Sequence, residues 1–367
     1  MTLLEIFTLI IFISYFFLVV IVIIGFFSNK KTFKKHSKTI GISVLIPFRN
    51  EESKLAPLIK SLEKQNYPLA EIIFINDHST DSSVEVIQNF SHPNYQVKLI
   101  HLRENSNGKK SAIEMGIKES SFENVLTTDA DCVFSENWIS LHANEFLHSN
   151  SVSAGYVEME SKKGFWNKFQ QLEMISIQSV SLGLGKIGKP ISMSAANLSY
   201  QKGVFQNLNP FQFNHKTASG DDIYFLQSLK KNKININFLT DKDSRVITTS
   251  QSFKGYTQQR IRWMRKSSSF SDFTTILVGL IIFLASFQFI FITGYQLVTT
   301  EWNLLLLISI CLKIIFDFLL LFLVTHHWKK KELLFWFLPV FLMNVFFTTL
   351  LPIIGWIIPL SWKGRKI

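Results

Sequence analysis

The distribution of apolar residues divides the chain into apolar ends and a long polar middle. Residues 6–27 carry no charge and are long enough to span a bilayer, which takes about 20 apolar residues. A second uncharged run covers residues 274–298, and a third apolar run, interrupted by Lys313 and Asp317, covers about 303–325. The pattern therefore predicts a polar domain between membrane segments.

The first apolar run is interpreted as a retained anchor, because it is too long for a cleaved signal and no small-residue cleavage site follows it. The lysine-rich SNKKTFKKHSK comes next, and the positive-inside rule places that end of the anchor in the cytoplasm. The last apolar stretch, residues 333–360, is interrupted by Pro339, Pro352 and Gly355. This stretch fits either a helix that crosses the membrane or a broken helix that enters the membrane and returns to the same side.

Strand and helix patterns alternate through the first part of the polar middle. They run in the order ISVLIPF, ESKLAPLIKSLEKQ, EIIFIND, STDSSVEVIQNF, QVKLIHL, GKKSAIEMGIKES and NVLTT. Such alternation is typical of a parallel sheet with helices on both faces. Each strand then delivers its following loop to the same edge of the sheet, where α/β proteins bind ligands.

Candidate ligand-binding residues, most of them polar, lie near the end of each of these strands. They are Pro47, Asn50 and Glu51 after the first strand, Asp77 after the second, Lys109 near the third, and Asp129 and Asp131 after the fourth. Carboxylates, cations and a divalent metal together suit a nucleoside diphosphate. The chain has no Walker or GxGxxG loop, which argues against a phosphate-loop ATPase or a dinucleotide-binding protein.

The stretch VLTTDADCVF places Asp129 and Asp131 one residue apart after a short buried strand. In an extended chain both carboxylates would point the same way, roughly 6–7 Å apart, and a hard cation such as Mg²⁺ would separate them. The alternative is a polar turn that caps the next helix.

Charge and cysteine content narrow the class of protein. Much of the net charge of +11 lies beside the apolar segments, which fits anionic lipid headgroups better than nucleic acid. Cys132 and Cys311 are too few and too far apart for a disulfide framework or a cysteine metal site. Lys313 and Asp317 share one helix face inside an apolar run, where they are either functional or a pair that neutralises itself.

The ordered motifs ISVLIPFRNEE, INDHSTDSS, GKKSAIEMG, TTDADCVF, SAANLSY, GDD and QRIRW, in residues 40–265, resemble the inverting glycosyltransferases of family 2. The resemblance implies a GT-A fold and a base contact for Asp77, with Lys109 near the nucleotide. It further implies that Asp129 and Asp131 bind ribose and the metal, Asp131 being the more direct ligand. Two departures, Asn76-Asp77 for two aspartates and GDD for Gly-Glu-Asp, leave the donor base and sugar open.

Inverting transfer needs a base on the acceptor hydroxyl, and Asp222 of GDD, beside Asp221, is our choice. The alternative is an ordinary helix start, where acidic residues are favoured. In QRIRW, Gln259 and Arg262 share a helix face for the diphosphate or acceptor, and Trp263 offers an aromatic platform. The same segment also fits a basic helix at a membrane surface.

Residues 163–184 place large apolar side chains at near-helical spacing. They fit a core helix, but between membrane segments we expect a helix that lies on the membrane surface and brings the site to the lipid headgroups.

Together these features predict an α/β protein with a GT-A domain, an N-terminal anchor and C-terminal transmembrane helices. The expected regions are the anchor at 1–28, a basic linker at 29–40, the catalytic domain with interfacial helices at 41–266, and a membrane region at 267–367. The expected protein is a multi-pass enzyme of the cell membrane whose catalytic domain is cytoplasmic.

The expected reaction moves a single sugar from a nucleotide sugar, most simply a UDP-sugar, to a lipid or lipid-linked saccharide, with Mg²⁺ or Mn²⁺ as cofactor. The Gln-x-x-Arg-Trp spacing, together with the terminal WKGR sequence, resembles the ceramide glucosyltransferase type. A processive polysaccharide synthase is the first alternative. A non-catalytic membrane transport or assembly protein is the second.

Overall fold

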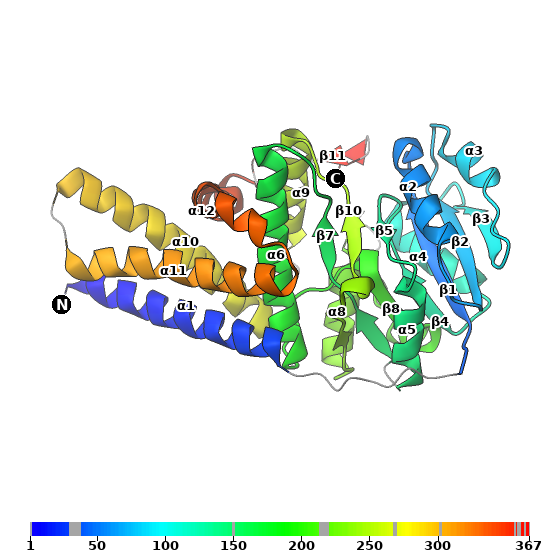
Figure 1. The fold of residues 1–367 in the computed structure, drawn as a ribbon, viewed down its shortest axis with the longest axis horizontal. Helices are drawn as coiled ribbons and strands as arrows, with labels where there is room; N and C mark the ends of the chain where they lie inside the picture. The colour runs from blue at the N-terminus through cyan, green and yellow to red at the C-terminus, as the bar shows by residue number, and fades with distance from the viewer. Residues whose placement is uncertain are drawn as a thin grey trace.

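The structure is a computed structural model that describes residues 2–28, 38–148, 151–212, 220–266, 270–300, 303–355, 357, 361–362 and 365–366. Most of the predicted basic linker, residues 29–37, lies outside this range. Figure 1 shows the α/β domain at one end of the molecule and long apolar helices at the other.

The main sheet has the strand order β3-β2-β1-β4-β8-β6-β9. Its strands are β1 (Ile42–Phe48), β2 (Ala70–Asn76), β3 (Gln96–His101), β4 (Asn124–Thr127), β6 (Val152–Ala154), β8 (Leu198–Gln201) and β9 (Asn237–Phe238). The four strands predicted from the sequence are parallel neighbours, as expected. The sheet as a whole is mixed, because β8 runs antiparallel to both β4 and β6.

Short helices cover this sheet. They are α2 (Glu52–Glu63), α3 (Ser83–Gln88), α4 (Gly108–Glu119) and α5 (Trp138–Leu147), followed later by α7 (Lys202–Leu208) and α8 (Asp221–Lys231). The spacing of Leu55, Leu58 and Leu62 puts one face of α2 on the sheet, and all three side chains are buried. Strands β1 and β2 are buried almost throughout, as expected when helices cover both faces.

A small second sheet brings a later part of the chain beside the turn after β4. It has the order β5-β10-β7, with β5 (Val133–Phe134), β7 (Val157–Met159) and β10 (Val246–Thr248). Short 3₁₀ turns lie at Ala195–Asn197 and Lys242–Ser244, and α9 (Phe253–Lys266) follows β10. Strand β10 therefore ends close to the aspartates after β4.

Four helices are long and apolar enough to cross a membrane in the described part of the chain. They are α1 (Leu3–Phe27), α10 (Phe273–Thr299), α11 (Leu304–His327) and the segment that joins the 3₁₀ turn Lys331–Trp336 to α12 (Phe337–Ile354). Helices α1, α10 and α11 run side by side in Figure 1, whereas α12 takes a different direction. Strands β11 (Ser361–Trp362) and β12 (Arg365–Lys366) pair beyond α12.

Helix α6 (Phe165–Lys186) joins the two ends of the molecule, running across the ends of the long helices in Figure 1. The expectation that its apolar stripe faces a membrane surface is wrong for Phe169, Leu172 and Ile175, because these side chains are buried among protein residues. At its crossing with α1, a Cβ on Gly25 would lie 2.0 Å from the Gly183 carbonyl oxygen. Only glycine permits so close a contact between the two backbones.

A second junction lies at the end of α11. The Trp328 ring stacks on Tyr156, with 4.6 Å between centroids, and the Lys330 ammonium lies 2.7 Å from the Glu158 carboxylate. Because Tyr156 and Glu158 belong to the α/β domain around β7, the membrane helices and this domain are held together by side-chain contacts as well as by the chain.

Candidate active site

The chain turns at Asp129–Cys132, where the Cys132 N–H donates to the Asp129 carbonyl at 3.2 Å. The expectation of an extended Asp-x-Asp segment with both carboxylates on one side is therefore wrong. Asp129 lies beside a lysine of α4, and Asp131 lies beside the end of β10. The turn separates the two carboxylates into different environments.

Lys109 connects two of the predicted motifs. Its ammonium lies 2.6 Å from the Asp129 carboxylate and 3.3 Å from that of Asp221. Burial alone would lower the pKa of Lys109, but the charges of Asp129 and Asp221 outweigh burial and raise this pKa above its ordinary value. The neighbouring Lys110 has another role: its ammonium lies 4.5 Å from the centre of the Tyr224 ring.

Helix α8 presents the two aspartates of GDD differently. Gly220, at φ 100°, makes the turn into the helix, and Asp221 then becomes buried beside Lys109. Asp222 is half-buried, and one of its carboxylate oxygens accepts from the Ile223 N–H at 2.9 Å. Asp221 is thus held in an ion pair, and Asp222 remains the better candidate for a base.

Arg262 of α9 completes this cluster. Burial lowers the pKa of its guanidinium, and the negative charges of Asp129, Asp222 and Asp221 partly offset that effect. An arginine remains protonated under these conditions. The structure thus gathers the TTDAD, GKK, GDD and QRIRW segments around one group of charges.

Asp131 lies apart from these cations. One of its carboxylate oxygens accepts hydrogen bonds from the hydroxyls of Thr248 and Thr249, each at 3.1 Å. Lys54 is close enough for the charge of Asp131 to raise its pKa, although burial acts against this and Glu51 contributes more. The Thr248 and Thr249 contacts had no signal in the sequence, since these residues lie more than 100 positions from Asp131.

The donor set fits a metal that also binds substrate. No cluster of three or more His, Cys, Asp or Glu side chains in the described residues is placed to hold a metal ion. Mg²⁺ and Mn²⁺ nevertheless bind through one or two carboxylates plus phosphate and water oxygens, and Asp131 makes no ion pair within the described chain. Asp129, the other predicted metal ligand, is engaged by Lys109.

The loops after β1 and β2 are tied to each other. Asn50, at φ 52°, accepts from the Thr80 N–H at 2.8 Å, and the Glu51 N–H donates to the Ser83 hydroxyl at 2.9 Å. Asp77 is buried, and its N–H donates to the Phe48 carbonyl at 2.9 Å. Pro47 lies within β1. These predicted donor-binding residues therefore shape one rigid pair of loops.

The QRIRW segment contains a pair that the sequence did not reveal. Arg260, between the predicted Gln259 and Arg262, is buried and donates to the Glu173 carboxylate of α6 at 2.9 Å. Its guanidinium also lies 4.2 Å from the centre of the Trp263 ring, and it donates to the Gln259 side chain at 3.2 Å. Gln259 and Trp263 thus support Arg260, in addition to any contact with a ligand.

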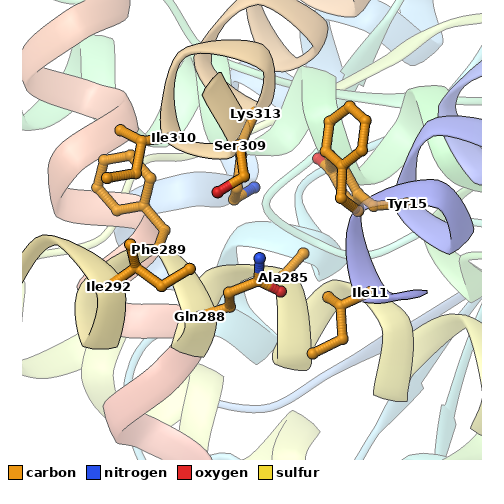
Figure 2. Close-up of a pocket in the computed structure, with 10 residues that line it drawn as sticks. Ile11, Tyr15, Ala285, Gln288, Phe289, Ile292, Ser309, Ile310 and Lys313 are labelled. Carbon is orange, nitrogen blue, oxygen red and sulfur yellow. The ribbon is translucent and has the colours of Figure 1, made fainter. Parts of the chain in front are cut away.

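Two cavities lie between the membrane helices. One, of about 20 Å³, is bordered by α1, α10 and α11, and Figure 2 shows Tyr15, Gln288, Ser309 and Lys313 around it. The other, of about 80 Å³, extends past Tyr15 and Lys313 to Glu173 on α6. Its lining combines apolar residues with Ser176, Ser286, Asp317, Asn344 and Thr348.

Comparison with known proteins finds a family model that matches part of the chain. Residues 43–207 match the sequence model described as "Glycosyl transferase family 2". This segment is therefore similar to glycosyl transferase family 2 domains, and the match covers less than half of the chain. The matched range contains the main sheet through β8 and the Asp129–Asp131 turn, whereas GDD and QRIRW follow it.

The chain is similar to poly-beta-1,6-N-acetyl-D-glucosamine synthases. It is 31% identical over 189 residues to that of Staphylococcus epidermidis, a match covering 49% of this chain and 44% of the relative. With the Staphylococcus aureus strain COL protein the identity is 28% over 151 residues, covering 41% and 36%. The chain therefore spans less than half the length of these curated relatives.

A solved structure supports the fold. The mannosyltransferase PcManGT from Pyrobaculum calidifontis, in complex with GDP-Man and Mn²⁺, matches with a TM-score of 0.52 and 12% identity. The match covers 94% of this chain and 99% of the other. The family domain and the mixed α/β sheet confirm the predicted GT-A fold, with long apolar helices at both ends.

Proposed function

We propose that the protein is a membrane glycosyltransferase that extends a polysaccharide, taking sugars from a UDP-sugar such as UDP-N-acetylglucosamine. The observation that carries the proposal is the cluster formed by Lys109, Asp129, Asp221 and Arg262 beside Asp222, in which Lys109 and Asp129 belong to the segment that matches the glycosyl transferase family 2 model. The cluster joins loops from distant parts of the chain and provides both an acid–base group and fixed cations.

In the proposed reaction, the half-buried Asp222 accepts the proton of the acceptor hydroxyl while that oxygen attacks the anomeric carbon. Arg262 balances charge on the departing diphosphate, for which a planar guanidinium is suited. Lys109 holds Asp129 and Asp221 in position between the loops. Asp77, with Asn50 and Glu51 in the tied loops, shapes the place of the nucleoside.

Asp131 would hold the divalent metal, Mg²⁺ or Mn²⁺, with Asp129 nearby. When bound, the metal supplies charge stabilisation for the diphosphate leaving group. The carboxylate of Asp131 suits this role because its hydrogen-bond donors are neutral hydroxyls, which leave its charge available.

Polymer extension has better support than our initial expectation of a single transfer to a lipid. The curated relatives described above are named poly-beta-1,6-N-acetyl-D-glucosamine synthases, which are polysaccharide synthases. A lipid or lipid-linked acceptor remains the second candidate, because the long apolar helices would keep the site beside a lipid surface.

We further propose that the catalytic domain lies on the cytoplasmic side of the cell membrane. Lys330, just after α11, pairs with Glu158 of this domain, and the sequence that follows α1 is rich in lysine, which the positive-inside rule assigns to the cytoplasmic side. Nucleotide sugars made in the cytoplasm would then reach the site directly.

The experiment is turnover of UDP-, GDP- and dTDP-sugars by the full chain purified in detergent, with Mn²⁺ and either membrane lipid extract or short oligosaccharides as acceptor. We expect release of UDP and products of increasing length from oligosaccharides. A single product on lipid would support the second candidate instead. Neither binding nor turnover of any donor would support a non-catalytic protein. Glu85→Gln, an exposed carboxylate on α3, is the control.

A further inference from the structure

The Asp131 carboxylate is held by two neutral donors from one distant segment. Thr248 ends strand β10 and Thr249 follows it, and both hydroxyls donate to the same oxygen, Oδ2, at 3.1 Å. Two donors occupy the hydrogen-bonding capacity of Oδ2 in the carboxylate plane. The other oxygen, Oδ1, has only a weak contact of 3.7 Å with the Cys132 thiol among the described residues.

This arrangement contrasts with that of Asp129. Asp129 is neutralised by the Lys109 ammonium at 2.6 Å, whereas hydroxyls orient Asp131 without cancelling its charge. An oriented carboxylate that keeps its charge and one open oxygen is suited to one bond with a hard divalent cation. Groups that hold a ligand in this way commonly change metal affinity 10- to 100-fold when they are removed.

The two threonines are themselves fixed on both sides. The Thr248 carbonyl accepts from the Glu160 N–H at 2.9 Å, and the Ser250 hydroxyl donates to Glu160 at 3.0 Å. One residue further on, the Gln251 N–H donates to the Gln170 side chain of α6 at 2.8 Å. The hydroxyls are thus presented by a segment, Thr248–Gln251, that is anchored to β7 and to α6.

We propose that Thr248 and Thr249 are positioning residues for the metal, which fix Asp131 so that Oδ1 takes the cation of a nucleoside diphosphate complex. The inference rests on the proposed function, because it assigns the metal to the same site. Through Gln251 and Gln170, the position of Asp131 also depends on α6, the helix that packs on membrane helix α1.

The test is the affinity of the full chain in detergent for Mn²⁺ in the presence of UDP, measured by the electron paramagnetic resonance of free Mn²⁺. The double variant Thr248→Val/Thr249→Val keeps the side-chain shape and removes both hydroxyls. We expect its Mn²⁺ affinity to fall about 10- to 100-fold. UDP binding without metal should change less than twofold, because the threonines do not contact the proposed nucleoside loops.

Two further variants separate positioning from folding. Thr248→Ser/Thr249→Ser restores both hydroxyls and should recover most of the affinity. Ser250→Ala removes the next hydroxyl, which bonds Glu160 rather than Asp131, but keeps the Ser250 N–H bond to Glu160 at 2.8 Å that anchors the segment, so this variant should bind Mn²⁺ like the native chain. Equal Mn²⁺ affinity in the valine variant and the native chain overturns the inference while leaving the proposed function in place. A native chain that binds neither UDP nor Mn²⁺ with UDP overturns both.

Discussion

Lys109 and Lys313 each pair with an aspartate, at 2.6 and 3.0 Å, but in surroundings that differ in charge balance. In α11, Lys313 and Asp317 neutralise each other, Tyr15 of α1 donates to the same aspartate, and the Lys313 ammonium lies over the Tyr15 ring. Around Lys109, two carboxylates, those of Asp129 and Asp221, share one ammonium, and Asp131 forms no ion pair within the described part of the chain.

This difference in charge balance indicates different roles for the Lys313 pair and the Lys109 cluster. Lys313 and Asp317 neutralise each other within an apolar region and stabilise the packing of α1 on α11. This agrees with the interpretation of the sequence in which the two residues form a structural ion pair. A carboxylate that no neighbouring cation neutralises can take up a cation from solution. This surplus charge at Asp131 distinguishes a ligand-binding site from a structural ion pair.

The largest effect is expected from Asp222→Asn, which removes the proposed base with little change in shape. Transfer should fall by about 10²- to 10⁴-fold, because general base catalysis contributes that much. UDP-sugar affinity should remain within a few-fold of native. The measurement is the rate of UDP release together with donor binding; an active Asp222→Asn variant would exclude this residue as the base.

Breaking the membrane pair is expected to affect stability. Lys313→Met leaves a carboxylate without its cation, and it should lower the free energy of unfolding by about 3–5 kcal/mol. The double change Lys313→Met/Asp317→Leu should recover most of this, since it removes both charges. Thermal unfolding in detergent measures the effect. If the stable double variant loses polymer extension, the pair takes part in the reaction and our comparison is wrong.

A change at the crossing of α1 and α6, where the membrane helices meet the catalytic domain, is expected to have a smaller effect on stability. Gly25→Leu would force side-chain atoms into the Gly183 carbonyl, and we expect a loss of about 3 kcal/mol. Gly279→Leu in α10 is the matched control, because nothing lies within 4 Å of a Cβ there. Unfolding temperatures of both variants test this; equal values would show that α1 and α6 do not pack closely.

A buried histidine gives the catalytic domain a pH dependence of its own. Burial lowers the pKa of His142 to about 4, although the bond with Asn197 acts in the opposite direction. The unfolded chain then binds the proton more readily, so stability is lost as the pH falls from about 6.5 toward 4. At pH 5 the loss is about 2 kcal/mol. His142→Gln should flatten this decline in unfolding temperature between pH 7 and pH 5; an unchanged slope would contradict the assignment.

The sequence predicted those parts of the site that follow local patterns. Alternating strands and helices located Asp77, Lys109 and Asp129 at one sheet edge, because parallel strands end together. The joining of GDD and QRIRW to that edge was expected only from the family resemblance. The assigned roles of these residues, and the predicted domain boundaries, remain predictions.

Other features depend on contacts between distant segments and left no pattern to find. The hydrogen bonds that hold the Asp131 carboxylate depend on the position of β10, and the Thr248 bond spans 117 residues. Arg260 could not be told from Arg262 without seeing Glu173, 87 residues away. The apolar stripe of α6 was assigned to a membrane surface because the periodicity of apolar residues shows only that one helix face is covered. It does not show whether protein or lipid covers that face.

The most direct test of the account is binding of UDP-N-acetylglucosamine to the full chain with and without Mn²⁺, by isothermal titration in detergent, for the native protein and Asp131→Ala. We predict binding that is strengthened at least tenfold by Mn²⁺ in the native protein and is insensitive to Mn²⁺ in the variant. Binding that Mn²⁺ strengthens equally in both would contradict the claim that the surplus charge at Asp131 receives the metal.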